Sequence, residues 1–417
     1  MVAAVVWTHL YSNYPFIYCN NEVPPCTETR NMAALAVVGR SRCPALLSSR
    51  FADDQNAWRQ QGRFLLYCSR GGGFGSWLKG LGSALTISIL AERALILNST
   101  CEQLPTAVAK YIAGYFQGSG FDWTAGTRGE GWVERGGRSR MTISPVCRAS
   151  VRPCGYNRTT VQGKPVADSS LLELHAGEHA MVDKIRDKPA RARMLALFRG
   201  PLFRRSEQQD SWYEIWDALH SCAFELFMQP TLRLTALSDA FFSRHGVHRG
   251  ANGKPRLVAI HARLGDGNMR TDRSVIKTNQ GDVSWVSEQR PNAMRSDPLG
   301  ALSCFSTMQP GSMHLLITDS SQAAECAHRN GVVTTRGDAV HLGATSQLRQ
   351  TDVDKLMLDW WLLAVSREAG RFGPSQSNFL VTARWRHGEA QLQTRDFSRG
   401  CNRSAAFAAT CDRLTPK

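Results

Sequence analysis

In residues 258–270, VAIHARLGDGNMR, an apolar run is followed by the imidazole of His261, the guanidinium of Arg263 and the carboxylate of Asp266. His261 and Arg263 alternate with apolar neighbours, so their side chains point to one side of a strand. Arginine presents a planar fork of donors that suits phosphate oxygens, and histidine can donate or accept a hydrogen bond toward a base or a sugar. Asp266 is placed to hold the arginine, to bind a hydroxyl or to act as a base. A purely structural ion pair between Arg263 and Asp266 explains the segment equally well.

A glycine loop, residues 71–75, is a second candidate for binding phosphate. Its backbone can approach a phosphate closely, and the helix expected after it offers unpaired N–H groups at its N-terminus. The P-loop motif fails because Leu81 and Gly82 stand in place of lysine and serine or threonine. The dinucleotide fingerprint fails at Ser76, where glycine is needed, and at Asn98, where an acid is needed. A loop that touches a substrate and a plain tight turn are equally good interpretations.

A turn of small and hydroxylated residues, GPSQS at 373–377, is a third candidate. It follows an expected strand and leads into an expected helix. Ser375, Ser377 and the amides around Gln376 and Asn378 would stand at the N-terminus of that helix, where anions bind. An arginine site and a serine-rich helix start in one α/β domain together suit a diphosphate.

The pentapeptide HAGEH, residues 175–179, matches H-x-x-E-H, the inverted zinc-protease pattern. On a helix, His175 and His179 would lie one turn apart and could share a metal, with Glu178 as the base. Gly177 weakens such a helix, and the neighbouring residues are ordinary amphipathic sequence. A solvated helix face is the better interpretation, and a zinc metallopeptidase is kept as an alternative.

Strands and helices that alternate in two segments must position these residues, and they indicate an α/β protein. The first expected unit is strand 64–68, the glycine loop, helix 76–93 and strand 94–97. The second has strands 256–262, 313–318 and 331–335 and helices 320–329, 352–368 and 377–387. Further helices are expected at 168–184 and 207–243, the latter with Trp212, Trp216, Phe224 and Phe227 in a core. Residues 1–60 and 118–165 are expected to be a loop-rich extension and a long excursion, and His245–Pro255 a domain boundary.

The charge balance favours anionic ligands. The chain has 417 residues, a formal net charge of +15 and 42% hydrophobic residues, which is a globular composition. Nucleic acid, an anionic membrane surface and a nucleotide-like molecule all suit a positive field. The basic residues do not interleave with aromatic residues in runs, which weakens nucleic-acid binding. No stretch approaches the roughly 18–20 apolar residues of a transmembrane helix.

Twelve cysteines are many for a cytosolic protein. Several lie in close pairs whose spacing suits local disulfides, and there are sequons for N-glycosylation, so both features fit a secretory compartment. The N-terminus has no basic segment and little apolar sequence, so it is a poor signal peptide. We therefore expect either a truncated N-terminus or a different compartment. The cysteine pairs are 19 with 26, 147 with 154 and 401 with 411; the sequons begin at Asn98, Asn157 and Asn402.

Three blocks, in this order, resemble the fucosyltransferases that share an H-x-R-x-G/T-D motif. These are the α-1,6 enzymes including the bacterial nodulation type, the α-1,2 enzymes and the protein O-fucosyltransferases. GGGFGSWLKGLGSALTISILAERALIL at 71–97 resembles the acceptor-side glycine loop and helix, and VAIHARLGDGN at 258–268 the diphosphate motif. LDWWLLAVSREAGRFGPSQSNFLVTA at 358–383 resembles the donor-binding block.

The resemblance implies a GT-B-like α/β fold of two facing Rossmann-like domains. They would follow an N-terminal extension (1–60) as an acceptor-side domain (61–250) and a donor-binding domain (251–417). The implied activity is inverting transfer of fucose from GDP-fucose to a glycan or glycoprotein hydroxyl, without a metal or other cofactor. The implied catalytic residues are Arg263, which stabilises departing GDP, and Asp266 as the candidate base. The implied donor-binding residues are His261, Arg263, Gly73, Gly75, Asp359, Ser375, Gln376, Ser377, Asn378 and Phe379.

The resemblance also implies a place in the secretory pathway, in the Golgi lumen. The expected partners are a GDP-sugar donor and a glycan or glycoprotein acceptor, with no nucleic acid. The motifs indicate GDP and its phosphates more than the hexose. A non-catalytic relative that binds GDP or a glycan is the alternative to the enzyme, alongside the zinc metallopeptidase.

Overall fold

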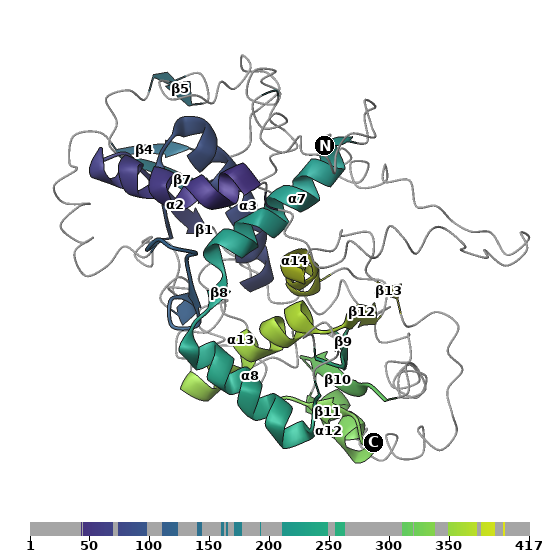
Figure 1. Ribbon diagram of the computed structural model, residues 1–417. Coiled ribbons are helices and arrows are strands. Elements are labelled where there is room, and N and C mark those ends of the chain that lie inside the picture. The colour runs from purple at the N-terminus through teal and green to yellow at the C-terminus, as the bar shows by residue number, and fades with distance from the viewer. Residues whose placement is uncertain are drawn as a thin grey trace, which may run out of the picture. The chain divides into compact units, whose positions relative to one another are not determined.

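In the computed structural model, the residues described below all lie within one unit, Arg40–Lys417. Figure 1 shows its elements in chain order. The described residues are Cys43, 45–69, 74–97, 111–123, 140–143, 160–161, 164–165, 171–176, 192, 211–248, 255–262, 311–319, 321–337, 349–372, 377–387 and 395–396.

A four-stranded parallel sheet forms in the N-terminal half. Its strand order is β2 (Ala94–Leu97), β1 (Phe64–Ser69), β7 (Leu171–Ala176) and β4 (Arg140–Ile143). All three pairings are parallel, and Leu65 lies between Leu95 and Leu172 in register. Leu65 and Leu95 are fully buried, as expected for a parallel sheet that helices cover on both faces.

A five-stranded parallel sheet forms in the C-terminal half. Its strand order is β11 (Val333–Thr334), β10 (Met313–Thr318), β9 (Leu257–Ala262), β12 (Glu368–Phe372) and β13 (Arg395–Asp396). In order of appearance along the chain this is 3-2-1-4-5, the arrangement of a Rossmann-type sheet. The expected fold class, α/β with two Rossmann-like parallel sheets, is confirmed.

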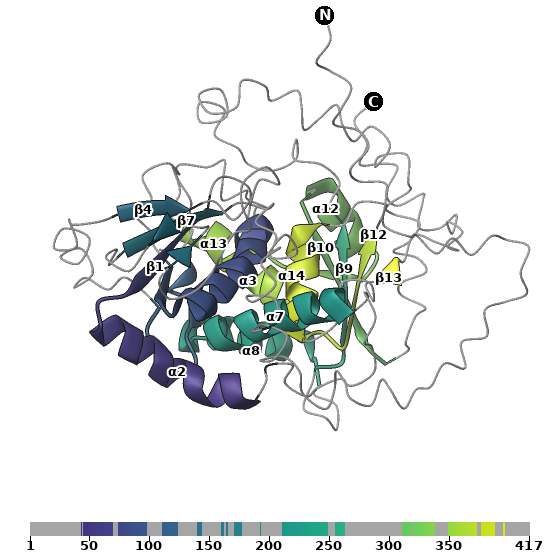
Figure 2. The same cartoon turned by 90° about the horizontal axis from the view of Figure 1, so that it is seen from above.

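Helix α3 (Phe74–Ala91) follows β1 and is buried on all sides, except at Ser76 and Lys79. It packs against β1, β2, β7, α7 (Ser211–Phe227) and α14 (Asn378–His387). Figure 2 shows α14 beside α3 and α7. The other helices are α2 (Ala45–Gln60), α8 (Leu232–His245), α12 (Ser321–Arg329) and α13 (Gln350–Val365).

One hydrophobic core runs through both halves. The ring of Trp360 on α13 is fully buried and makes edge-on contacts with Phe74, Phe116 and Phe224, whose centroids lie 5.8, 5.4 and 6.0 Å away. Its indole N–H donates to Thr382 Oγ1 at 3.1 Å. A tryptophan from the second sheet's helices is therefore packed by aromatic residues of the first half.

The helix that we expected over 168–184 is wrong for its described part, because residues 171–176 form strand β7. Leucine, glutamate and alanine favour helix locally, but pairing between β1 and β4 overrides that preference. His175 is opposite Cys68 in a sheet and is not on a helix. The helical basis of the zinc alternative is thus lost, and Glu178 and His179 lie outside the described residues.

Other differences concern elements with weak periodicity. The loop-rich extension expected to residue 60 ends instead in α2, which buries Phe51 against Phe121 and Phe227. The helix expected over 207–243 is two helices, α7 and α8, separated by β8 (Gln229–Pro230), which pairs with β3 (Phe116–Gln117). Phe224 and Phe227 are in the core, as expected. The long excursion contains β4 and a short ribbon of β5 (Thr160–Val161) and β6 (Lys164–Pro165).

The disulfide described in full is not one of the close pairs expected from the sequence. It joins Cys43, just before α2, to Cys222 on α7, 179 residues away. Cys68 at the end of β1 is also disulfide-bonded. The three expected local pairs lie outside the described residues.

Candidate functional site

The topology of each sheet points to the same place for a ligand. In the second sheet the chain runs from β9 to β10 and β11 on one side, then returns to β12 on the other side of β9. A crevice opens outside the carboxyl ends of two strands where the strand order reverses in this way. In the first sheet the corresponding point lies at β1, between β2 and β7. Helix α3 begins just after β1, and α14 begins just after β12.

The N-terminus of α14 has the features of an anion site. Ser377 is the N-cap residue, since its carbonyl accepts the Val381 N–H at 3.1 Å. The first N–H groups of the helix then have no intrahelical acceptor and point out of its end. The Ser377 side chain is only 5% exposed, and its hydroxyl has no hydrogen-bond partner in the described part of the chain. A buried hydroxyl without a protein partner is costly, so this one is a candidate donor to a bound anion.

The N-terminus of α3 meets the N-terminus of α14. A Cβ placed on Gly75 would lie 2.6 Å from the Asn378 carbonyl carbon and 2.8 Å from the Phe379 Cα. Only glycine permits this approach of two backbones. The positive ends of two helix dipoles therefore lie together, which an anion between or beside them would stabilise.

Side chains also join the two helix starts. The Asn378 side-chain amide donates to Ser76 Oγ at 3.3 Å. The Phe379 ring lies 6.1 Å from the Phe74 ring and stacks on the His261 imidazole at 5.5 Å, with 27° between the planes. His261 is the second-to-last residue of β9, beside Ile317 of β10 and Arg371 of β12 in register. The structure thus brings together five of the expected donor-binding residues: His261, Gly75, Ser377, Asn378 and Phe379.

Asp359 has partners inside the protein. Its carboxylate accepts from Lys355 Nζ at 2.7 Å and from Thr335 Oγ1 at 2.5 Å, and all three side chains are buried. Lys355 Nζ also donates to Thr335 Oγ1. The contacts tie α13 to the end of β11. A role for Asp359 in holding the donor stays a prediction.

The remaining expected site residues are Arg263, Asp266, Gly73, Ser375 and Gln376, and they lie outside the described residues. Phe74 and Ser76 are residues of the site that sequence reasoning missed. In the sequence, Ser76 stands out only as a break in the dinucleotide fingerprint, and Phe74 only as part of the loop at 71–75. No signal in the sequence indicated that either contacts residues some 300 positions later.

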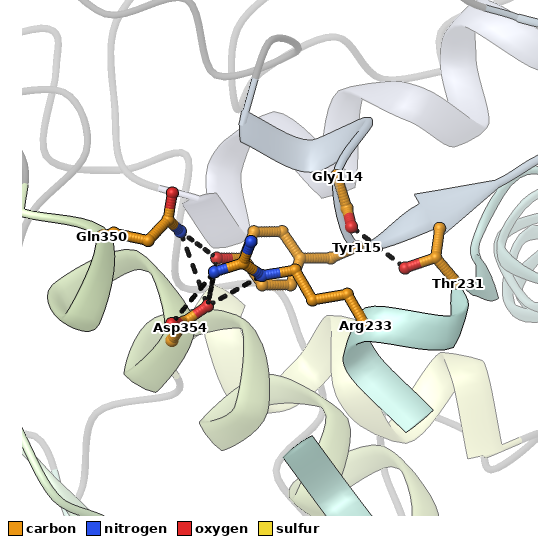
Figure 3. Close-up of polar contacts among 6 residues, drawn as sticks. All are labelled: Gly114, Tyr115, Thr231, Arg233, Gln350 and Asp354. Atoms are coloured by element: carbon orange, nitrogen blue, oxygen red, sulfur yellow. Dashed lines mark hydrogen bonds and ion pairs between the residues drawn. The ribbon is translucent and has the colours of Figure 1, made fainter. Parts of the chain in front are cut away.

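A polar cluster at the starts of α8 and α13 joins the two halves (Figure 3). The Tyr115 hydroxyl donates to Asp354 Oδ1 at 2.5 Å and accepts from the Gln350 amide at 2.6 Å. Arg233 binds both oxygens of Asp354 and lies 5.2 Å from the centre of the Tyr115 ring. Burial and the hydrogen bond to Asp354 raise the pKa of Tyr115. The hydrogen bond to Asp354 raises the pKa of Arg233. This cluster is fully paired and holds structure together.

No family model and no curated protein matches this chain. Solved fucosyltransferases are similar to it at low identity. NodZ alpha-1,6-fucosyltransferase soaked with GDP-fucose is 16% identical, with a TM-score of 0.37, over 78% of this chain and 92% of that chain. Fucosyltransferase NodZ from Bradyrhizobium is 15% identical, with a TM-score of 0.36, over 77% and 93%. A mutant of Arabidopsis thaliana FUT1 in complex with GDP is 12% identical, with a TM-score of 0.39, over 85% and 75%. Such values assign no activity to this chain.

Among the described residues, no helix is both long and apolar enough to cross a membrane.

Proposed function

We propose that this protein is a glycosyltransferase that moves fucose from GDP-fucose to a hydroxyl of a glycan or glycoprotein. The observation that supports it most is the buried, unpartnered hydroxyl of Ser377 at the N-terminus of α14, beside the point where the strand order reverses. A phosphate oxygen would accept from that hydroxyl and from the first N–H groups of the helix. These residues and the three sequence blocks, and not the weak similarity to solved fucosyltransferases, support the proposal.

The proposed chemistry is direct displacement. An acceptor hydroxyl attacks the anomeric carbon, a base removes its proton, and the bond to the β-phosphate oxygen breaks with inversion. Departing GDP carries the new negative charge, which Arg263, Ser377 and the N-terminus of α14 would stabilise. Asp266 is the proposed base. In this scheme Arg263, Ser377 and the N-terminus of α14 stabilise the negative charge on the leaving group, so we propose that no metal is needed.

The proposed donor site has further members. His261 would contact the nucleotide, Gly73 and Gly75 would border the cleft from the other half, and the remaining expected donor-binding residues would hold guanosine and phosphate. The remaining residues are Asp359, Ser375, Gln376, Asn378 and Phe379. The proposed location is the secretory pathway, with the Golgi lumen as the expected compartment. The buried disulfide of Cys43 and Cys222 supports an oxidising compartment.

The test is calorimetric titration of GDP into wild type and Ser377→Ala. Hydrogen bonds to charged groups are the stronger kind, so we expect GDP affinity to fall by about tenfold or more. The variant removes a buried hydroxyl without a partner, so its free energy of unfolding should be unchanged or slightly higher. Arg263→Ala should also weaken binding. Ser238→Ala is the control, because its hydroxyl only bonds within its own helix, to the Thr235 carbonyl.

Two outcomes would contradict the proposal. Wild type that binds no GDP would exclude a GDP-sugar donor. If Ser377→Ala binds GDP as tightly as wild type, the N-terminus of α14 is not the GDP site. A third outcome, GDP binding without hydrolysis or transfer of GDP-fucose over long incubation, would identify the non-catalytic relative instead of the enzyme.

A further inference from the structure

Helix α3 makes its contacts with the proposed donor site through its first turn. Phe74 is 3% exposed, and its ring centroid lies 5.8 Å from that of Trp360 and 6.1 Å from that of Phe379. Ser76, one of two residues of α3 that are not buried, accepts a hydrogen bond from Asn378. Both contacts reach the first turn of α14, the turn that Ser377 caps.

We propose that Phe74 and Ser76 are positioning residues of the nucleotide-diphosphate site, so that the N-terminal half completes a site formed mainly by the C-terminal half. The inference rests on the proposed function. It goes further by assigning a role to two residues that are not among the expected donor-binding residues.

Ser76 acts through Asn378. Asn378 follows Ser377 directly, so fixing the Asn378 side chain fixes the backbone that carries the Ser377 hydroxyl and the first N–H groups of α14. An anion held by N–H groups needs them aimed at one point, and small misalignments weaken such bonds steeply.

Phe74 acts through Phe379. The Phe379 ring stacks on His261 at 5.5 Å and is half-buried, so without a second contact it could turn away from the imidazole. Phe74 supplies that contact from the other half, and its own position is fixed by Trp360. His261, at the end of β9, is thereby held at one orientation by a chain of aromatic contacts that begins in α3.

The experiment is a double-mutant cycle on GDP affinity in the full chain, with Ser76→Ala, Asn378→Ala and the double variant. We expect Ser76→Ala to weaken GDP binding by about threefold to tenfold, the range for losing one neutral hydrogen bond. The double variant should then be no weaker than Asn378→Ala alone, because the pair acts as one unit. Ser76→Thr keeps a hydroxyl and should restore most of the affinity. Ser238→Ala is again the control.

Phe74→Leu tests the aromatic chain, with Phe51→Leu as its control. Phe51 is also fully buried and packs against three aromatic rings, but none of them belongs to α14. Both variants should lower the melting temperature. Only Phe74→Leu should also weaken GDP binding and shift the His261 ring proton resonances, identified by their absence in His261→Gln.

The possible results separate the two proposals. Wild type that binds no GDP would overturn the proposed function, and the inference with it. If wild type and the controls bind GDP alike and Ser76→Ala and Phe74→Leu also bind it as tightly, the proposed function stands and the inference is wrong. Additive effects in the Ser76 and Asn378 cycle would likewise overturn it.

Discussion

Gly75 offers the sharpest perturbation of the junction between the two helix starts. In Gly75→Ala the new methyl group would lie 2.6 Å from the Asn378 carbonyl carbon and 2.8 Å from the Phe379 Cα, whereas ordinary contacts are 3.4–4 Å. Both neighbours are backbone atoms, so no side-chain rotation relieves the clash. The first turn of α14 must therefore retreat by about 1 Å, and we expect this overpacking to cost about 1–3 kcal/mol of unfolding free energy.

The displaced turn is capped by Ser377, so the substitution should weaken ligand binding as well as stability. A misplacement of about 1 Å in a site can cost about a hundredfold in function, and we expect GDP affinity to fall by roughly tenfold to a hundredfold. Titration calorimetry with GDP and urea unfolding would measure both effects on the same preparations.

Gly246→Ala is the matched control. Gly246 ends α8 at φ +62°, and no atom outside its own chain neighbours lies within 4 Å of a Cβ built there. Alanine at a left-handed position costs roughly 1–2 kcal/mol, so the control loses comparable stability far from the site. If Gly75→Ala binds GDP as tightly as Gly246→Ala does, the two helix starts do not form a ligand site and the reasoning is refuted.

Three further predictions concern the frame around the site. Replacing Cys43 and Cys222 by alanine removes a cross-link that closes 179 residues, and urea unfolding should show a loss of about 2–5 kcal/mol; an unchanged midpoint would contradict it. Tyr115→Phe removes the hydroxyl bonded to Asp354 and should cost about 1–3 kcal/mol, with a non-additive cycle against Asp354→Ala in the same assay; additivity would show that the cluster in Figure 3 is not one unit. Burial, followed by the charges of Arg244 and Arg336, lowers the pKa of His245 in the folded protein. The contribution of His245 to the free energy of unfolding is therefore complete above its ordinary pKa of about 6.5 and is lost as the pH falls through the lower folded pKa. Between about pH 7 and pH 5, His245→Gln should lose less stability than wild type in urea titrations, and equal losses would argue against this.

Much of the fold could be predicted because its strongest signals are local. The apolar run of β9 and the helical spacing in α3 and α13 depend only on neighbouring residues, and these elements were located to within a few residues. Strand β7 could not be predicted, because its residues favour helix and only pairing with β1 and β4 makes them a strand. Helix α2 likewise shows no clear apolar face in its sequence.

The site was predicted in part for the same reason. Ser377 and His261 stand beside recognisable patterns, a helix start and a strand end. Phe74 lies in the glycine loop and Ser76 follows it, but that pattern does not show what either residue contacts, because the partners lie some 300 positions away. The disulfide between Cys43 and Cys222 could not be predicted for the same reason. Close spacing in the sequence favours local cysteine pairs, whereas the fold brings together two cysteines that are 179 residues apart.

The place of Trp360 has a consequence for how such a chain can evolve and be engineered. Its ring packs against Phe74, Phe116 and Phe224, so a tryptophan of the C-terminal half and three phenylalanines of the N-terminal half share one interior. Chimeras that join the N-terminal half of one such chain to the C-terminal half of another would create a void or a clash at this ring unless these phenylalanines are transferred with it. Changes in surface loops should therefore be better tolerated than exchange of whole halves.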